Sequence, residues 1–171
     1  MATCNGHSKE GKMTKSVLQA AGWIFVGMVL MGLIVWFTMP SLMLINHKSN
    51  RSYDDTIAVL SEALKNKQDW RVLTINDYQK STAAFGAIER VGSMNICNPR
   101  HASKILAADR DRGVTAFMPL AIGVYEDKKG QVFVSRLNVG LLGMMFGGTI
   151  ADVMGKVGKD LNDFVVSVAA K

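Results

Sequence analysis

The chain has 171 residues, which leaves room for one domain of ordinary size and excludes a multidomain enzyme. Hydrophobic residues make up 49% of the chain and charged residues 20%, a composition that excludes an intrinsically disordered protein. The net charge of +6 is mild and scattered, so we expect no nucleic-acid partner, and two cysteines are too few for a disulfide scaffold or a cysteine-rich zinc module.

The first long apolar stretch predicts a transmembrane anchor helix over residues 16–39. Val17 to Met39 carries no charge and, at about 1.5 Å per residue, spans a bilayer core of roughly 30 Å. Trp23 and Trp36 lie near its ends, where amphipathic rings favour the headgroup boundary, and Pro40 is the expected stop. A cleaved signal peptide is the alternative, but its apolar region is usually about 7–15 residues and is followed by a small-x-small site.

Basic residues predict the orientation of this anchor in the cytoplasmic (inner) membrane. Three lysines precede the apolar stretch and two basic residues follow it: Lys9, Lys12 and Lys15 before, Lys48 and Arg51 after. Because cytoplasmic flanks are enriched in Lys and Arg, we expect residues 1–15 to form a cytoplasmic tail and the rest to lie in the periplasm or outside the cell. Cys4 and Cys97 would then lie on opposite sides of the membrane and could not pair.

A juxtamembrane linker is expected over residues 40–51, followed by one domain over residues 52–171. The domain begins with a helix that Ser52 or Asp54 can cap, and whose apolar periodicity ends near Lys67. Residues 70–75 are rich in β-forming residues and predict a strand, whereas residues 76–85 are ambiguous.

A second strand is predicted from Val91 to Cys97, and a helix follows it directly. Asn98 is a favourable N-cap, and Pro99 suits the first helical position because its missing N–H costs nothing there. We expect this helix to run to Asp109 or Asp111.

The second half predicts a β-hairpin and a long C-terminal helix. Two β-branched runs, 114–126 and 131–138, flank a loop over residues 127–130 whose Asp and Gly suit a tight turn. Thr149 with Asp152 predicts the start of the final helix. Strands mixed with flanking helices, including an antiparallel hairpin, predict an α+β fold behind one transmembrane helix.

Several of these features, in this order, resemble a known family. They are Cys97-Asn98-Pro99, Met118-Pro119, the strand Val124 to Asp127 with Gly130 and Val132, and the pair Gly147-Gly148. Over Tyr53 to Phe164 the chain resembles the domain-of-unknown-function family 302. The resemblance implies a compact α+β domain, often dimeric, that occurs alone or attached to membrane anchors and other modules in bacteria and archaea. It implies no established reaction, and Cys97 before the Asn-Pro pair is expected to mark a subset of members.

Cys97 is the central candidate site residue, because it precedes a helix start whose dipole favours a thiolate. His101 follows four residues later, and Met94 and Met118 can add thioether sulfurs. Cys, His and Met together suit a copper ion or haem iron. The alternatives are a small buried thiol in the core and a redox or nucleophilic thiol.

Two further sites are candidates. Asn98, Arg100 and Lys104 surround the predicted helix start, where unpaired amides and positive charge could bind a carboxylate or phosphate; a solvated helix surface is the alternative. The glycine-flanked segment between hairpin and final helix could form a pocket flap, a membrane-facing lip or a partner surface, or simply pack in the core. Its apolar residues are Leu141, Leu142, Met144, Met145 and Phe146.

We therefore expect a membrane-anchored binding or accessory protein that takes a small ligand, copper or haem near Cys97. The expected partners are the lipid bilayer, a second copy of the chain, or a membrane protein complex. The alternative is an enzyme that uses Cys97 as a thiolate, aided by His101, in redox or sulfur chemistry. A purely structural subunit is the third hypothesis.

Overall fold

A computed structural model describes the backbone of residues 7–169 and the side chains of residues 17–168. The chain falls into two units, Met1–Ser41 and Leu42–Lys171. The tail expected over residues 1–15, with Cys4 and the His7 side chain, lies outside the described side chains.

Helix α1 (His7–Met43) contains the expected apolar segment. Its part Val17–Met43 has a mean hydropathy of 2.2 and is not buried within the protein, so it is long and apolar enough to cross a membrane. The prediction that Pro40 ends this helix is wrong, because Pro40 lies inside it. Proline cannot donate a helical hydrogen bond and crowds the carbonyl four residues earlier, yet three further residues keep the helical conformation after it.

The domain is built on one antiparallel sheet of five strands, in the order β1-β5-β4-β3-β2. The strands are β1 (Leu44–Lys48), β2 (Arg71–Asp77), β3 (Val91–Cys97), β4 (Leu120–Glu126) and β5 (Val132–Leu137). The structure confirms the β4-β5 hairpin, whose loop is tied by Asp127 Oδ1 accepting from the backbone N–H groups of Lys129 and Gln131, both at 2.9 Å. Strand β4 begins later than expected, since residues up to Phe117 form a 3₁₀ helix.

Strand β1 corrects the expected linker over residues 40–51. Leu44–Lys48 pairs with β5 along its whole length, and the pairing continues where Ser49 N–H donates to the Val132 carbonyl at 2.9 Å. This strand is short, lies at the sheet edge and is half polar, so its own residues carry little β signal. Its conformation depends on the partner strand.

The helical elements of the domain correct several predicted boundaries. They are α2 (Tyr53–Lys65), α3 (Tyr78–Thr82), η1 (Ala83–Phe85), α4 (Pro99–Leu106), η2 (Asp109–Phe117), α5 (Val139–Phe146) and α6 (Gly148–Ala169). The caps at Ser52 and Asn98 are confirmed: each side chain accepts a backbone N–H three residues later at 3.2 Å. Helix α4 ends before Asp109, where η2 takes over. Thr149 does not cap α6, because Gly147 already accepts the N–H of Ala151 at 3.1 Å.

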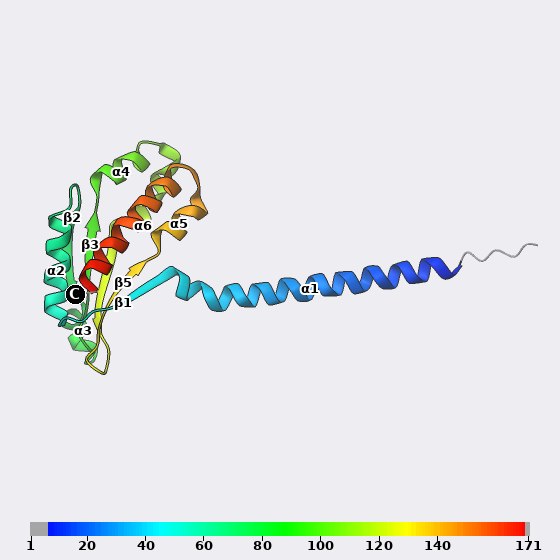
Figure 1. Ribbon diagram of the computed structural model, residues 1–171, viewed down its shortest axis with the longest axis horizontal. Helices are drawn as coiled ribbons and strands as arrows, with labels where there is room; N and C mark the ends of the chain where they lie inside the picture. Colours follow the sequence, from blue (N-terminus) through cyan, green and yellow to red (C-terminus); the bar gives the residue numbers. More distant parts are fainter. Residues whose placement is uncertain (1–6, 170–171) are drawn as a thin grey trace, which may run out of the picture. The chain divides into compact units, whose positions relative to one another are not determined.

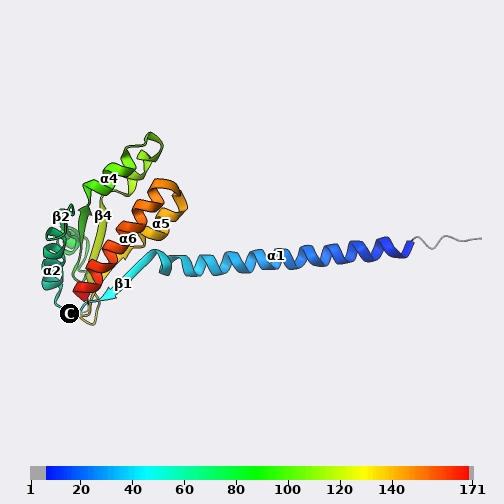
Figure 2. The ribbon, with the colours of Figure 1, turned by 45° about the horizontal axis from the view of Figure 1, so that its top comes forward.

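Helices α2 and α6 cover one face of the sheet, α4 lies at the end of β3 against α6, and α5 packs beside α6 (Figures 1 and 2). The core lies between these layers, so the expected α+β class is confirmed. Its fully buried side chains come from α2, from the inward positions of β3, β4 and β5, and from α6; they include Leu60, Leu64, Ile96, Ile122, Val134, Leu161 and Val165.

Two polar side chains lie at the β1/β5 edge of this core, Arg136 buried and His47 half-buried. Arg136 is 5% exposed, and His47 has a buried Nε2 without a hydrogen-bond partner. Burial, and then the nearby Arg136 charge, lower the pKa of His47 below the ordinary histidine value near 6.5. His47 is therefore favoured as the neutral imidazole in the folded domain.

Gly143 tests the packing of α5 against α6. A Cβ there would lie 2.5 Å from the Met154 Cβ, which is closer than packed side chains can approach. We expect Gly143→Ala to lower the free energy of unfolding by about 1–3 kcal/mol. Gly155→Ala on α6 is the control, because a Cβ there meets no atom within 4 Å and should stabilise by up to about 1 kcal/mol. Chemical unfolding of the full chain in detergent measures the free energy of unfolding of both variants. Equal changes in the two variants would contradict the close packing of Gly143 against Met154.

His47 predicts a pH dependence of stability. Because its pKa is lower in the folded than in the unfolded chain, the unfolded chain takes up the proton first as the pH falls. The free energy of unfolding should therefore decrease below about pH 6.5 and be unaffected by His47 above it. We expect His47→Gln to lose less thermal stability than the wild type between about pH 7.5 and 5.5. Identical pH profiles in scanning calorimetry would contradict the assignment.

Candidate functional site

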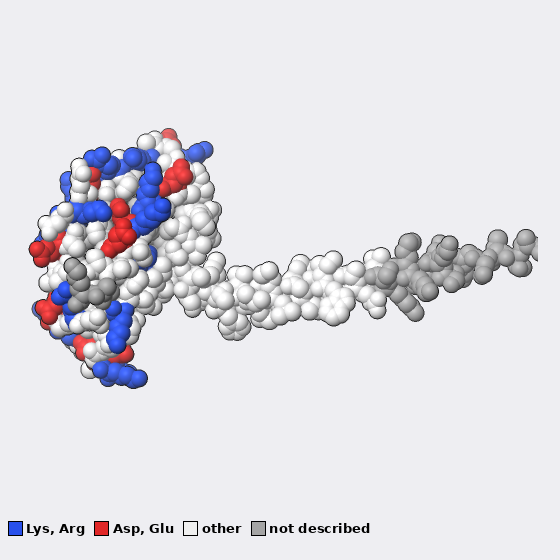
Figure 3. All heavy atoms as spheres, in the orientation of Figure 1, with Lys and Arg blue, Asp and Glu red and all other residues white. Residues whose placement is uncertain are grey.

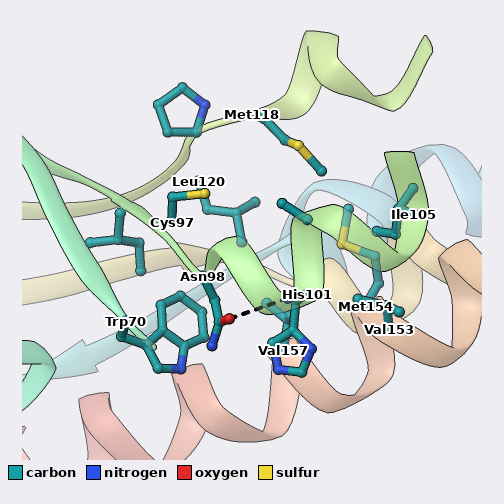
Figure 4. A pocket seen from close by; sticks show the side chains of 13 residues that line it. Trp70, Cys97, Asn98, His101, Ile105, Met118, Leu120, Val153, Met154 and Val157 are labelled. Carbon is teal, nitrogen blue, oxygen red and sulfur yellow. Dashed lines mark hydrogen bonds between the residues drawn. The ribbon is translucent and has the colours of Figure 1, made fainter. Parts of the chain in front are cut away.

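A cavity of about 40 Å³ lies where the end of β3, helix α4, the Met118-Pro119 segment and helix α6 meet. Figure 4 shows its lining from close by. Most lining side chains are apolar, among them Ile96, Ile105 and Val153. The volume is enough for an ion or a few water molecules, and it is about a tenth of the 300–1,000 Å³ typical of pockets for drug-sized ligands.

Three sulfur-bearing side chains line this cavity from three separate elements. Cys97 is the last residue of β3, Met118 precedes β4, and Met154 lies on α6. In Figure 4 the three side chains reach the same space from different sides. Cys97 is a free, half-buried thiol, and Met154 is 3% exposed. The fold thus gathers one thiol and two thioethers around one small apolar space.

His101 lines the same cavity from another wall. Its ring lies below α4, on the side of Trp70, and away from Cys97 and Met118 (Figure 4). Its Nε2 is 3.9 Å from Asp160 Oδ2, which also accepts a hydrogen bond from Trp70 Nε1 at 3.2 Å, while its Nδ1 is buried without a partner. The imidazole therefore faces Asp160 of α6, with which it can form an ion pair when it is protonated.

Of the predicted sulfur ligands, Met94 lies outside the cavity, and Met154, which was not predicted, lies in its wall. Met94 does not line the cavity: it is 1% exposed, in the core, paired in register with Ile122 of β4. Met154 was missed by sequence reasoning, although it follows Ile150 by one helical turn and shares the apolar face of α6. Only the packing of α6 over α4 shows that this methionine reaches Cys97's cavity.

The residues predicted to bind an anion at the start of α4 have other partners. Asn98 Oδ1 accepts the N–H of His101 at 3.2 Å. The Arg100 side chain pairs with Asp69 Oδ2 at 2.6 Å, which offsets its charge, and Lys104 is exposed. The geometry adds no support for an anion at this helix start, and that site stays a prediction.

The apolar segment 141–146 forms most of α5 and is divided between core and surface. Leu142 is buried and Leu141 is half-buried, whereas Met144 and Met145 are 67% and 70% exposed. Phe146 is also exposed, and its ring packs edge to face against the ring of Phe117, with the two ring centroids 6.0 Å apart. Figure 3 shows the surface over α5 as a region without charged side chains.

Two observations narrow the ligands that suit the cavity. Among residues 17–168, no three His, Cys, Asp or Glu side chains are grouped so that they could hold a metal ion. A metal at Cys97 would therefore need the methionine sulfurs as ligands. A haem macrocycle is much larger than a space of about 40 Å³ and does not fit without a rearrangement of α4 or α6.

A scan against protein families matches the model for "Domain of unknown function DUF302" over residues 45–168. The chain belongs to the DUF302 family. This confirms the resemblance seen in the sequence and extends it, since the match begins in β1, where a linker was expected.

A solved structure supports the DUF302 fold. It is an uncharacterised conserved DUF302 protein from Bacillus stearothermophilus, 20% identical to this chain, with a TM-score of 0.66. The match covers 74% of this chain and 98% of that protein. No curated protein matches the chain.

Alkylation of Cys97 tests whether its thiol lies in the cavity of this DUF302 domain. In a Cys4→Ser background, we expect maleimide to modify native Cys97 about tenfold more slowly than the unfolded chain, because the thiol is half-buried among apolar side chains. Met154→Ala should speed the native reaction by opening the cavity wall. Met145→Ala, on the exposed side of α5, is the matched control and should leave the rate unchanged. Mass spectrometry gives the rates, and a Met154→Ala rate equal to the control would contradict the geometry.

Proposed function

We propose that this DUF302 protein is a membrane-anchored binding protein that takes a soft monovalent metal ion, Cu(I), in the Cys97 cavity. The observation that carries the proposal is the meeting of Cys97, Met118 and Met154 around one small space. Thiolate and thioether ligands are soft donors and select Cu(I) over hard cations. The cysteine would bind as the thiolate, releasing its proton to solvent.

The surroundings of the cavity favour this ion over the other predicted ligands. An apolar lining solvates a thiolate poorly, so the thiolate gains more from a bound cation there than in water. A Cu(I) thiolate is neutral overall, which suits an apolar site. A single ion also fits a cavity of about 40 Å³.

The enzyme hypothesis receives less support. The enzyme hypothesis assigns His101 as the base that activates Cys97, and the His101 ring lies on another wall beside Asp160. A binding role needs no base. We therefore favour binding over thiol-dependent redox or sulfur chemistry.

For the whole chain we propose a single-pass anchor formed by α1, with the DUF302 domain in the periplasm or outside the cell. The support is the apolar segment Val17–Met43 and the slight excess of basic residues before it. The exposed end of α5, at Met144, Met145 and Phe146, is the surface we propose for contact with the bilayer or a membrane partner.

Metal titration of the full chain in detergent tests the binding site. In a Cys4→Ser background, we expect one equivalent of Cu(I) or the redox-inert Ag(I) to bind in competition with a chromogenic chelator. Cys97→Ser should weaken binding on the order of a hundredfold, and Met154→Leu on the order of tenfold, because each removes a sulfur ligand.

Met145→Leu is the matched control, since this methionine is 70% exposed and does not line the cavity. Its affinity should equal that of the wild type. Metal binding that is unsaturable, or that is equally strong in Cys97→Ser, would overturn the proposal.

A further inference from the structure

A second, open cleft lies between the end of β5, the start of α5 and the middle of α6. Its volume is about 360 Å³, and it shares no lining residue with the Cys97 cavity. Two basic side chains, Arg136 and Lys159, line it together with the acidic Asp163, two asparagines and three glycines. This cleft is therefore chemically distinct from the sulfur-lined cavity.

Arg136 is the unusual group in this cleft. It is 5% exposed, one of its terminal nitrogens donates to Asn162 Oδ1 at 2.9 Å, and its Nε is buried without a partner. Within residues 17–168, no Asp or Glu lies within ion-pair distance of it. A buried charge with neither counter-ion nor full hydrogen bonding is strongly unfavourable. Burial also lowers the pKa of Arg136, in line with an environment that lacks an anion.

Gly140, at the start of α5, lines the same cleft as this arginine. Gly140 lies in the first turn of α5, where N–H groups have no partner within the helix. A Cβ at Gly158 would lie 3.3 Å from the Gly140 nitrogen and would crowd it. With glycine at position 158, no Cβ of α6 crowds the Gly140 N–H, which lies at the positive end of the α5 dipole.

We propose that this cleft binds an oxyanion of the phosphate class, with Arg136 as the main ligand and Lys159 and the Gly140 N–H as further donors. A guanidinium pairs with phosphate oxygens through two parallel hydrogen bonds, and the anion satisfies the buried Nε. The negative charge of Asp163 offsets only one of the two basic side chains, so the cleft keeps a net positive charge.

Two kinds of molecule can supply the phosphate group that the cleft would bind. One is a phosphate group in solution. The other is a phospholipid headgroup, because Asn138 of the cleft hydrogen-bonds the last two residues of α1: its Nδ2 donates to the Leu42 carbonyl at 3.0 Å and its N–H to the Met43 carbonyl at 2.7 Å.

Thermal unfolding of the full chain tests the proposal in two arms. In the first arm, inorganic phosphate is titrated into detergent-solubilised protein at constant ionic strength held with chloride. In the second, the protein is placed in phosphatidylcholine nanodiscs with or without phosphatidylglycerol. We expect the unfolding temperature to rise with the anion in at least one arm.

Arg136→Met keeps an unbranched, flexible side chain and removes its charge. It should weaken anion binding on the order of a hundredfold, yet unfold no more easily than the wild type when no phosphate is present, because it removes an uncompensated buried charge. Lys159→Ala should weaken binding about fivefold without altering stability, since its side chain is exposed. Lys156→Ala, one turn earlier on α6 and outside the cleft, is its matched control.

Each outcome decides the matter. A rise with inorganic phosphate that Lys159→Ala or Arg136→Met removes assigns a soluble ligand, and a rise with phosphatidylglycerol alone assigns the lipid headgroup. If the unfolding temperature rises in neither arm, the proposal is wrong. It is also wrong if the anion raises the unfolding temperature equally in Lys159→Ala, Lys156→Ala and Arg136→Met. Cys97→Ser should leave all of these results unchanged, so a failure here is separate from a failure of the metal site.

Discussion

The placement of α6 across the sheet is the constraint on which both candidate sites depend. Its apolar face is buried against the sheet and α2 along the whole helix, through residues such as Leu161 and Val165. One side of this helix supplies Met154 to the sulfur-lined cavity, and another supplies Gly158 and Lys159 to the cleft beside Arg136. A rotation of α6 would displace a wall of both sites. The domain therefore gives two chemically different environments, one soft and apolar and one cationic, by packing a single helix.

The two environments illustrate what burial does to different groups. A thiol and thioethers cost little to bury, so the Cys97 cavity is stable without a ligand, and the proposed choice of metal rests on the softness of its sulfur atoms and on its size. A guanidinium is expensive to bury, so the surroundings of Arg136 are unfavourable without an anion. The proposed metal site therefore needs no bound ion for its stability. The proposed anion site, in contrast, leaves the buried charge of Arg136 unpaired when no anion is bound.

Much of the domain could be predicted because its signals are local. The bounds of β3, the caps of α2 and α4 and the β4-β5 hairpin follow from the residues within each element. Strand β1 and helix α5 could not, since β1 exists through pairing with β5 and α5 is apolar and glycine-rich along its length. Cys97 and Met118 were identified, whereas Met154 needed the packing of α6. Arg136 did carry a signal that was missed: it follows Val132 and Val134 at every second residue, which places a charge on the buried face of β5.

The central claim is that Cys97, Met118 and Met154 together form a soft metal site, and X-ray absorption at the metal edge tests it most directly. The full chain with Cys4→Ser would be loaded with one equivalent of Ag(I) or Cu(I) and compared with the same chain carrying Met154→Leu. The account expects a first shell made mainly of sulfur, with one fewer sulfur scatterer in the variant. A shell of nitrogen and oxygen atoms, or a shell that the variant leaves unchanged, would contradict it.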